Sequence, residues 1–173
     1  GPVITVSDLR GIPLFAGVPD DEASTLASRL GDVRLRTGDW LVHEGEQPSF
    51  FLLLEGSLEL FKVVHGVERR LHEYQAGVYF GEVPLLLGSP PIASLRAKDP
   101  ARVAQLEPSD FRAMFAECHV FATELIGTMK IAFGGMTAEE QFFGESGTGP
   151  ASDLIAATRI AAQLNLPTDR IED

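Results

Sequence analysis

Hydrophobic residues recur at helical spacing near the start of the chain. Ala23, Leu26, Ala27 and Leu30 lie one, three or four positions apart, so they would share one face of a helix. Acidic side chains at positions 20–22 precede them, where the positive end of a helix dipole favours negative charge. The pattern therefore predicts an N-terminal helix in this segment.

Between residues 32 and 107 the pattern changes to short β-rich runs that glycines separate. The glycines recur at intervals of roughly ten residues, a spacing typical of an all-β sandwich or barrel. No long helical pattern interrupts the runs, which argues against a parallel sheet with crossover helices. The predicted strands cover residues 33–36, 40–42, 50–54, 58–64, 67–74, 92–97 and 102–106.

Helical spacing returns after the last predicted strand. Residues 108–115 predict one helix, and residues 121–133 predict a second helix with Leu125, Met129 and Phe133 in one apolar stripe. An exposed stripe of this kind is typical of an interface. We therefore expect a homodimer that forms through the second helix.

Changes of composition divide the chain into three parts. Residues 3–133 form the predicted domain, residues 134–151 a glycine-rich linker, and residues 152–173 a C-terminal helical extension. The extension has the pattern of a helix that begins a further region. The opening Gly1-Pro2 is typical of residues that a protease leaves behind, which favours a piece of a longer protein.

Composition restricts the partners of this chain. Its 173 residues, 45% of them hydrophobic, are enough for one packed domain and a small extension. A formal charge of −11 repels phosphate backbones and anionic lipid, so we expect neither a nucleic-acid nor a membrane partner. The single cysteine, Cys118, fits a reducing compartment, and no apolar run reaches the length of a membrane span. We expect a cytoplasmic location.

The most informative motif combines a strand end, a glycine, one carboxylate and a turn of apolar helix. A glycine lets the backbone approach a ligand closely, and the free N–H groups at a helix start can bind an anion. A carboxylate beside them can accept hydrogen bonds from ligand hydroxyls. The motif predicts a ligand-binding loop, and it reads Phe80-Gly81-Glu82-Val83-Pro84-Leu85-Leu86-Leu87-Gly88-Ser89-Pro90-Pro91.

This motif resembles the phosphate-binding cassette of the cyclic nucleotide-binding domain family. Residues 38–46 and 50–60 are similar to segments of that family's β-roll, so the resemblance extends over residues 8–133. It implies an α+β, mainly β fold. The expected architecture is an antiparallel double-stranded β-helix, or jelly-roll-like β-roll, flanked by N- and C-terminal helices.

The resemblance also implies a regulatory module that is not an enzyme. A cyclic nucleotide or related small anionic ligand would bind in the cassette and signal to an effector domain or partner protein through the helix at residues 121–133. In the family, the Phe-Gly-Glu glutamate holds the ribose 2′-hydroxyl, and an arginine after the cassette helix pairs with the cyclic phosphate. The implied ligand-binding residues here are Gly81, Glu82, Val83, Pro84, Pro91, Ile92, Ala93 and Thr128.

This chain departs from the family pattern where the arginine is expected. It has Pro91-Ile92-Ala93, and proline provides neither charge nor an N–H group. Arg96 is a poor substitute because strand alternation gives residues 91 and 96 opposite faces. We therefore expect cAMP and cGMP to bind weakly or not at all.

Two other functions compete with ligand sensing. A degenerate domain without a small-molecule ligand could act in dimerisation or docking, which the missing arginine and the negative charge favour. A cupin-type enzyme needs two histidines two positions apart on one strand, and the four histidines lack that spacing. We expect no metal and no cofactor beyond the possible cyclic nucleotide. The sequence leaves the ligand and the effector open.

Overall fold

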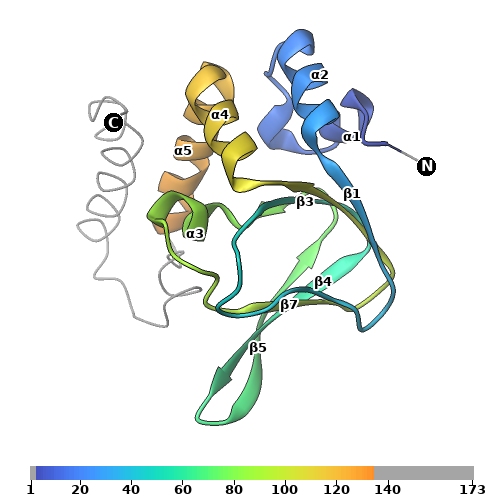
Figure 1. Ribbon diagram of the computed structural model, residues 1–173, viewed down its shortest axis with the longest axis vertical. Helices are drawn as coiled ribbons and strands as arrows, with labels where there is room; N and C mark the ends of the chain where they lie inside the picture. Colours follow the sequence, from blue (N-terminus) through green and yellow to red (C-terminus); the bar gives the residue numbers. More distant parts are fainter. Residues whose placement is uncertain (1–2, 135–173) are drawn as a thin grey trace.

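The structure of the protein is a computed structural model that describes residues 3–134, with side chains described for residues 3–127. Two four-stranded antiparallel sheets face each other in a roll, and most helices gather at one end of it (Figure 1). The predicted α+β, mainly β fold with an antiparallel β-roll is confirmed. The C-terminal extension at 152–173 and all but the first residue of the predicted linker lie outside the described residues.

The two sheets contain all seven predicted strands and one additional strand. The additional strand, β6, has two residues and is too short to leave a hydrophobic pattern. In spatial order the first sheet is β1 (Gly31–Leu35), β8 (Ala101–Leu106), β3 (Phe50–Glu55) and β6 (Tyr79–Phe80). The second sheet is β2 (Trp40–Val42), β7 (Ser94–Ala97), β4 (Ser57–Val64) and β5 (Val67–Gln75).

Strand β3 lies between two hydrophobic cores. Phe50 and Leu52 pack against the helices, whereas Phe51 and Leu53 point into the roll between the sheets. Successive side chains of a strand alternate between its faces, so both faces of β3 are buried. This explains why the strand is a continuous apolar run rather than an alternating one.

The helices cover one face of the first sheet. Those predicted after residue 20, after residue 107 and near residues 121–133 are confirmed, and a short helix at the N-terminus was not predicted. It begins with a capping box, in which Thr5 and Asp8 bond each other's backbone N–H groups. The elements are α1 (Val6–Arg10), the 3-10 helix η1 (Pro13–Phe15), α2 (Asp20–Arg29), α3 (Glu82–Leu87), α4 (Pro108–Glu117) and α5 (His119–Gly134).

The predicted apolar stripe on α5 is covered at Leu125. Its side chain is fully buried in the core of its own domain, together with Phe121. The Phe121 ring also stacks on Phe15, with the ring centroids 5.6 Å apart. The side chains of Met129 and Phe133 lie outside the described residues. The homodimer therefore stays a prediction, without the support of Leu125.

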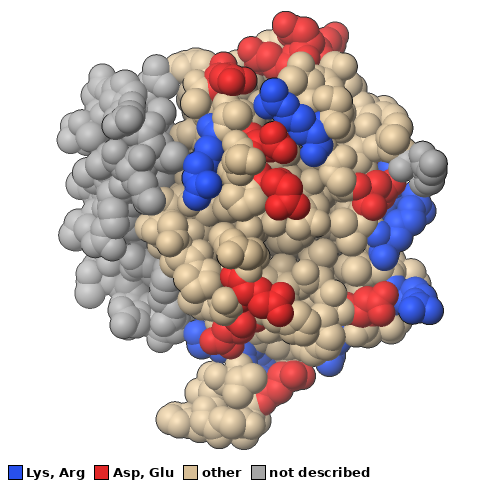
Figure 2. All heavy atoms as spheres, in the orientation of Figure 1, with Lys and Arg blue, Asp and Glu red and all other residues tan. Residues whose placement is uncertain are grey.

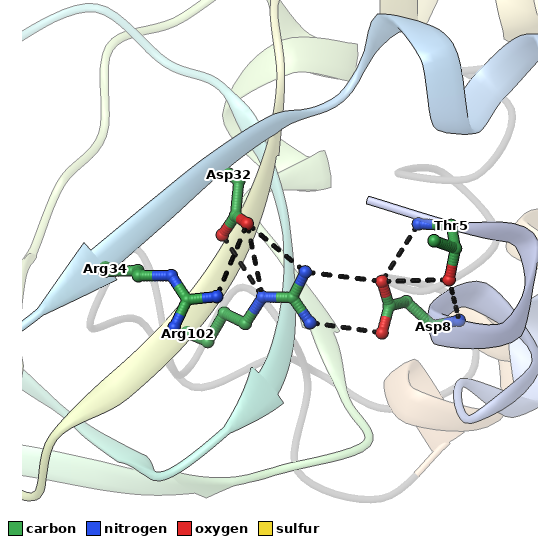
Figure 3. A network of polar contacts seen from close by, with 5 residues as sticks. All are labelled: Thr5, Asp8, Asp32, Arg34 and Arg102. Atoms are coloured by element: carbon green, nitrogen blue, oxygen red, sulfur yellow. Dashed lines mark hydrogen bonds and ion pairs between the residues drawn. The ribbon is translucent and has the colours of Figure 1, made fainter. Parts of the chain in front are cut away.

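A buried arginine joins the N-terminal helix to the roll (Figure 3). Arg102 on β8 donates to Asp8 at 3.1 Å and to Asp32 on β1 at 3.2 Å, and its side chain is only 13% exposed. Burial alone would raise the pKa of the Asp8 carboxyl, but hydrogen bonds from Thr5 and Arg102 hold that pKa below its usual value. The charged network thus fixes three elements that lie far apart in the sequence.

The surface shows no broad basic region on the face in Figure 2. Acidic side chains gather at the end that carries α2, and lysines and arginines are scattered among other residues. The β4–β5 hairpin projects away from the roll (Figure 1) and exposes Val63 and Val67. Within the described part of the chain, no helix is both long and apolar enough to cross a membrane.

Candidate functional site: the cassette between β6 and β7

The cassette occupies the connection between β6 and β7, where the chain turns from one sheet to the other. Gly81 begins it with φ of +92°, a left-handed conformation that strains any residue with a Cβ atom. A Cβ atom at this position would also overlap the carbonyl oxygen of Ser49. Glycine is therefore required here by both backbone conformation and space, and the close approach sets the direction of α3.

A small hollow lies inside the roll beside the cassette. Its volume is about 30 Å³, enough for one or two water molecules. The lining is almost entirely apolar. It includes five of the predicted ligand-binding residues, Gly81, Pro84, Pro91, Ile92 and Ala93, together with core side chains such as Leu60, Tyr74 and Leu95.

Glu82 follows Gly81, which lines this hollow, and one of its carboxylate oxygens has no partner. Its Oε2 atom is enclosed by protein and makes no hydrogen bond with the part of the chain that the structure describes. Burial raises the pKa of Glu82 to about 7, although its own backbone N–H acts in the opposite direction. The pKa of Tyr74, which lines the hollow, is raised by burial and by the charge of Glu82, so the two groups lie near each other.

This pKa predicts that Glu82 destabilises the folded protein at neutral pH. The Glu82 carboxyl binds its proton more tightly in the folded protein than in the unfolded chain. Its ionisation therefore lowers the free energy of unfolding. This loss is absent below the ordinary pKa of 4.5 and complete above about 7. We expect Glu82→Gln to raise the free energy of unfolding by about 2 kcal/mol at pH 8, a discounted value because the residue is partly exposed.

Urea unfolding followed by circular dichroism at pH 5 and pH 8 measures this effect. Most of the gain should disappear at pH 5, where the wild-type carboxyl is largely protonated in the folded state. As a control, Glu46→Gln removes an exposed carboxylate and should leave the urea midpoints of unfolding unchanged at both pH values. An equal gain for Glu82→Gln at both pH values would contradict the raised pKa.

The residues at the end of the cassette bring no charge to the hollow. Pro91 and Ala93 are buried, and Ile92 is half-buried. The backbone here is tied to the loop after β2, because Gly45 N–H donates to Pro91 O at 2.8 Å and Glu44 N–H donates to Ser94 Oγ at 2.9 Å. These two hydrogen bonds hold the segment against the loop after β2.

Arg96 lies on the outer face of the second sheet, as strand alternation predicts. Its guanidinium is 4.4 Å from the Phe61 ring centroid and 5.0 Å from that of Trp40. It also forms ion pairs of 3.8 Å with Glu59 and Glu68. Arg96 is not among the residues that line the hollow.

One cation near the cassette was missed by the sequence reasoning. Lys62 on β4 donates from Nζ to the carbonyl oxygen of Ile92 at 3.2 Å. The residue lies 30 positions before its acceptor, and the sequence alone does not pair β4 with β7. The register Phe61 opposite Ser94 places Lys62 beside the end of the cassette.

Three of the predicted ligand-binding residues, Glu82, Val83 and Thr128, are not among the residues that line the hollow. Val83 is 2% exposed and packs in the helix-side core, so its side chain does not reach the hollow. It faces the core because it is on the inner side of α3, with Leu86 on the next turn. A ligand contact of Val83 therefore stays a prediction, without support from the position of its side chain. The side chain of Thr128 lies outside the described residues.

Histidines and acids do not converge at this site. The ring centroids of His43 and Trp40 are 5.4 Å apart, and those of His72 and Tyr74 are 4.7 Å apart. In the part of the chain that the structure describes, no three His, Cys, Asp or Glu side chains lie close enough together to hold a metal ion. The chemistry of the cassette is that of hydrogen bonding and apolar contact.

Comparisons with known proteins place this geometry among regulatory domains. The chain is 35% identical over 107 residues to a cAMP-dependent protein kinase regulatory subunit from Emericella nidulans. The matched segment covers 61% of this chain and 26% of the relative. A fold match is the regulatory subunit of a cAMP-independent protein kinase A from Trypanosoma cruzi bound to guanosine. It has 21% identity, a TM-score of 0.62, and coverage of 71% of this chain and 44% of that one.

A second structure is a variant of the corresponding subunit from Trypanosoma brucei, bound to cAMP in its A site. It has 25% identity, a TM-score of 0.64, and coverage of 71% of this chain and 45% of that one. This chain spans about a quarter of the length of the curated relative. The family model of the cyclic nucleotide-binding domain matches residues 32–118, and the chain therefore belongs to the cyclic nucleotide-binding domain family.

Proposed function

We propose that this chain is the sensory domain of a regulatory protein, and that its cassette binds a ribose-bearing small molecule through Glu82. The observation that supports this proposal is the enclosed Oε2 atom of Glu82, which has no hydrogen-bond partner among the described residues. A buried carboxylate without a donor is costly, and ligand hydroxyls are donors of the required kind. The domain itself catalyses no reaction in this account.

Cyclic nucleotides are poor ligands in this proposal because residues 91–93 carry no charged group. The Trypanosoma brucei variant bound to cAMP contains an introduced arginine. Its three exchanges include a threonine and the next residue, a valine, replaced by arginine and alanine. Arginine followed by a small residue is the family pattern that Pro91-Ile92 lacks here.

A calorimetric panel tests the ligand class. We expect guanosine or adenosine to bind with an affinity at least about tenfold above that of the corresponding 2′,3′-dideoxynucleoside, because the lost hydroxyls leave the Glu82 carboxylate unpaired. Glu82→Gln should abolish this preference. Glu46→Gln should retain it. Nucleosides that bind equally well with and without the ribose hydroxyls would contradict the role of Glu82.

A docking domain without a small-molecule ligand is the second candidate. It is favoured by the hollow of about 30 Å³, which is too small for a nucleoside unless the cassette opens. In that case no member of the nucleoside and nucleotide panel would raise the melting temperature. Ligand binding to the folded state raises it by mass action, so a thermal-shift screen separates the two functions.

We place the domain upstream of an effector that α5 controls. The helix packs on α4 and on η1, so a shift of the cassette against the helix-side core would reach it. The effector is a further domain or a partner protein, and the location is the cytoplasm. We also propose that the chain self-associates through residues beyond 127.

Sedimentation velocity of wild type and Met129→Glu tests the self-association, since added charge at a dimer interface favours the monomer.

A further inference from the structure

Lys62 differs from the other basic residues that the structure describes. It is partly buried, and among the described residues no acidic side chain lies within ion-pair distance of it. The other partly buried basic residues all have acidic partners: Arg10 pairs with Asp20, Arg96 with Glu59 and Glu68, and Arg102 with Asp8 and Asp32. In a chain of net charge −11, a shielded lysine without a carboxylate is a feature that requires an explanation.

The strand directs Lys62 to the ligand side of the second sheet. Leu58 and Leu60 point into the roll, and alternation gives Lys62 the same face. The irregularity in the β4–β5 pairing does not change this, because the extra residue, Leu71, is on β5. The Nζ atom accordingly reaches Ile92 O at 3.2 Å, and Ile92 lines the hollow.

We propose that Lys62 provides a positive charge beside the cassette at a place distinct from that of the missing arginine, and that the ligand carries an anionic group other than a cyclic phosphate, which binds Lys62 Nζ. Three N–H donors are available on an ammonium group, and one is used by Ile92 O. A phosphate or carboxylate is a stronger acceptor for it than a neutral carbonyl. The ligand thus combines a ribose diol at Glu82 with an anionic group at Lys62, which rests on the proposed function for its ribose part.

Inorganic phosphate tests the anion site without any nucleoside. In NMR titrations of the full chain, we expect saturable shifts of the Ile92 and Ala93 amide signals in wild type and in Lys62→Arg, which keeps the charge. Lys62→Met should lose them. Arg29→Met removes one exposed, unpaired charge from α2 and should behave as wild type. Equal saturable shifts in Lys62→Met, or none in wild type, would overturn the proposal.

A nucleotide pair tests the combined ligand. AMP should bind about tenfold more tightly than adenosine to wild type, and this ratio should fall to about one in Lys62→Met. If adenosine binds through Glu82 and AMP binds no better, the role of Lys62 is wrong and the proposed function stands. If phosphate shifts Ile92 through Lys62 but neither compound binds, the ribose site is wrong and the anion site stands.

Discussion

Arg102→Leu should lower the free energy of unfolding by about 3 kcal/mol, or about 10 °C in melting temperature. The substitution leaves Asp8 and Asp32 with buried negative charge, because their side chains are only 24% and 12% exposed. Removing one partner of a buried charged network costs more than the network contributes in total, since the remaining charges lose their compensation. Thermal and urea unfolding followed by circular dichroism measure the loss.

Arg34→Leu is the matched control for this prediction. Arg34 also pairs with Asp32, but at 3.8 Å and with a side chain that is 58% exposed, so its removal should cost less than about 1 kcal/mol. The effect of Arg102→Leu should also fade in acid. Asp8 contributes fully to the free energy of unfolding above its ordinary pKa of 3.8. This contribution is lost as the pH falls through the lower pKa that Asp8 has in the folded protein. Equal costs for the two variants would contradict the network.

Pro91→Arg should increase the affinity for cAMP by about 30-fold or more. A charged hydrogen-bonded contact of this kind is worth roughly 2–5 kcal/mol, and each 1.4 kcal/mol is a factor of ten. The backbone bond from Gly45 N–H to Pro91 O does not involve the proline ring and can persist in the variant. Isothermal titration calorimetry of wild type and variant gives the ratio.

Pro91→Gln separates the charge from the loss of proline. Glutamine has a long polar side chain without the bidentate cation, so it should gain much less affinity than arginine. A gain of the same size for both variants would show that the proline ring had blocked the site. No gain for either would mean that the loop at residues 91–93 is shaped for a ligand other than a cyclic nucleotide.

Much of the fold could be predicted because the sequence signals are local. Short β-rich runs and glycines marked each strand of three or more residues, and apolar spacing marked α2, α4 and α5. Gly81 and Glu82 were recognised because one short motif contains both. In contrast, β6 is too short for a pattern, and α1 is five residues long, so its capping box was the main available signal.

The missed parts of the site depend on strand pairing. Lys62 meets Ile92 through the β4–β7 register, which no local pattern specifies. Leu125 was expected to contribute to a dimer interface. Helical spacing shows that residues share a face, but not which element covers that face. Val83 shows the same limit on a shorter helix. Its position in the motif suggested ligand contact, and the packing of α3 placed it in the core.

Calorimetry of the wild-type chain with cAMP and cGMP tests the central claim most directly. A micromolar complex corresponds to about 8 kcal/mol, and the loss of a charged phosphate contact removes roughly 2–5 kcal/mol of that. We expect dissociation constants weaker than about 100 μM for both nucleotides. A sub-micromolar constant for either one would contradict this expectation, because the cassette would then bind a cyclic phosphate without the arginine that Pro91 replaces.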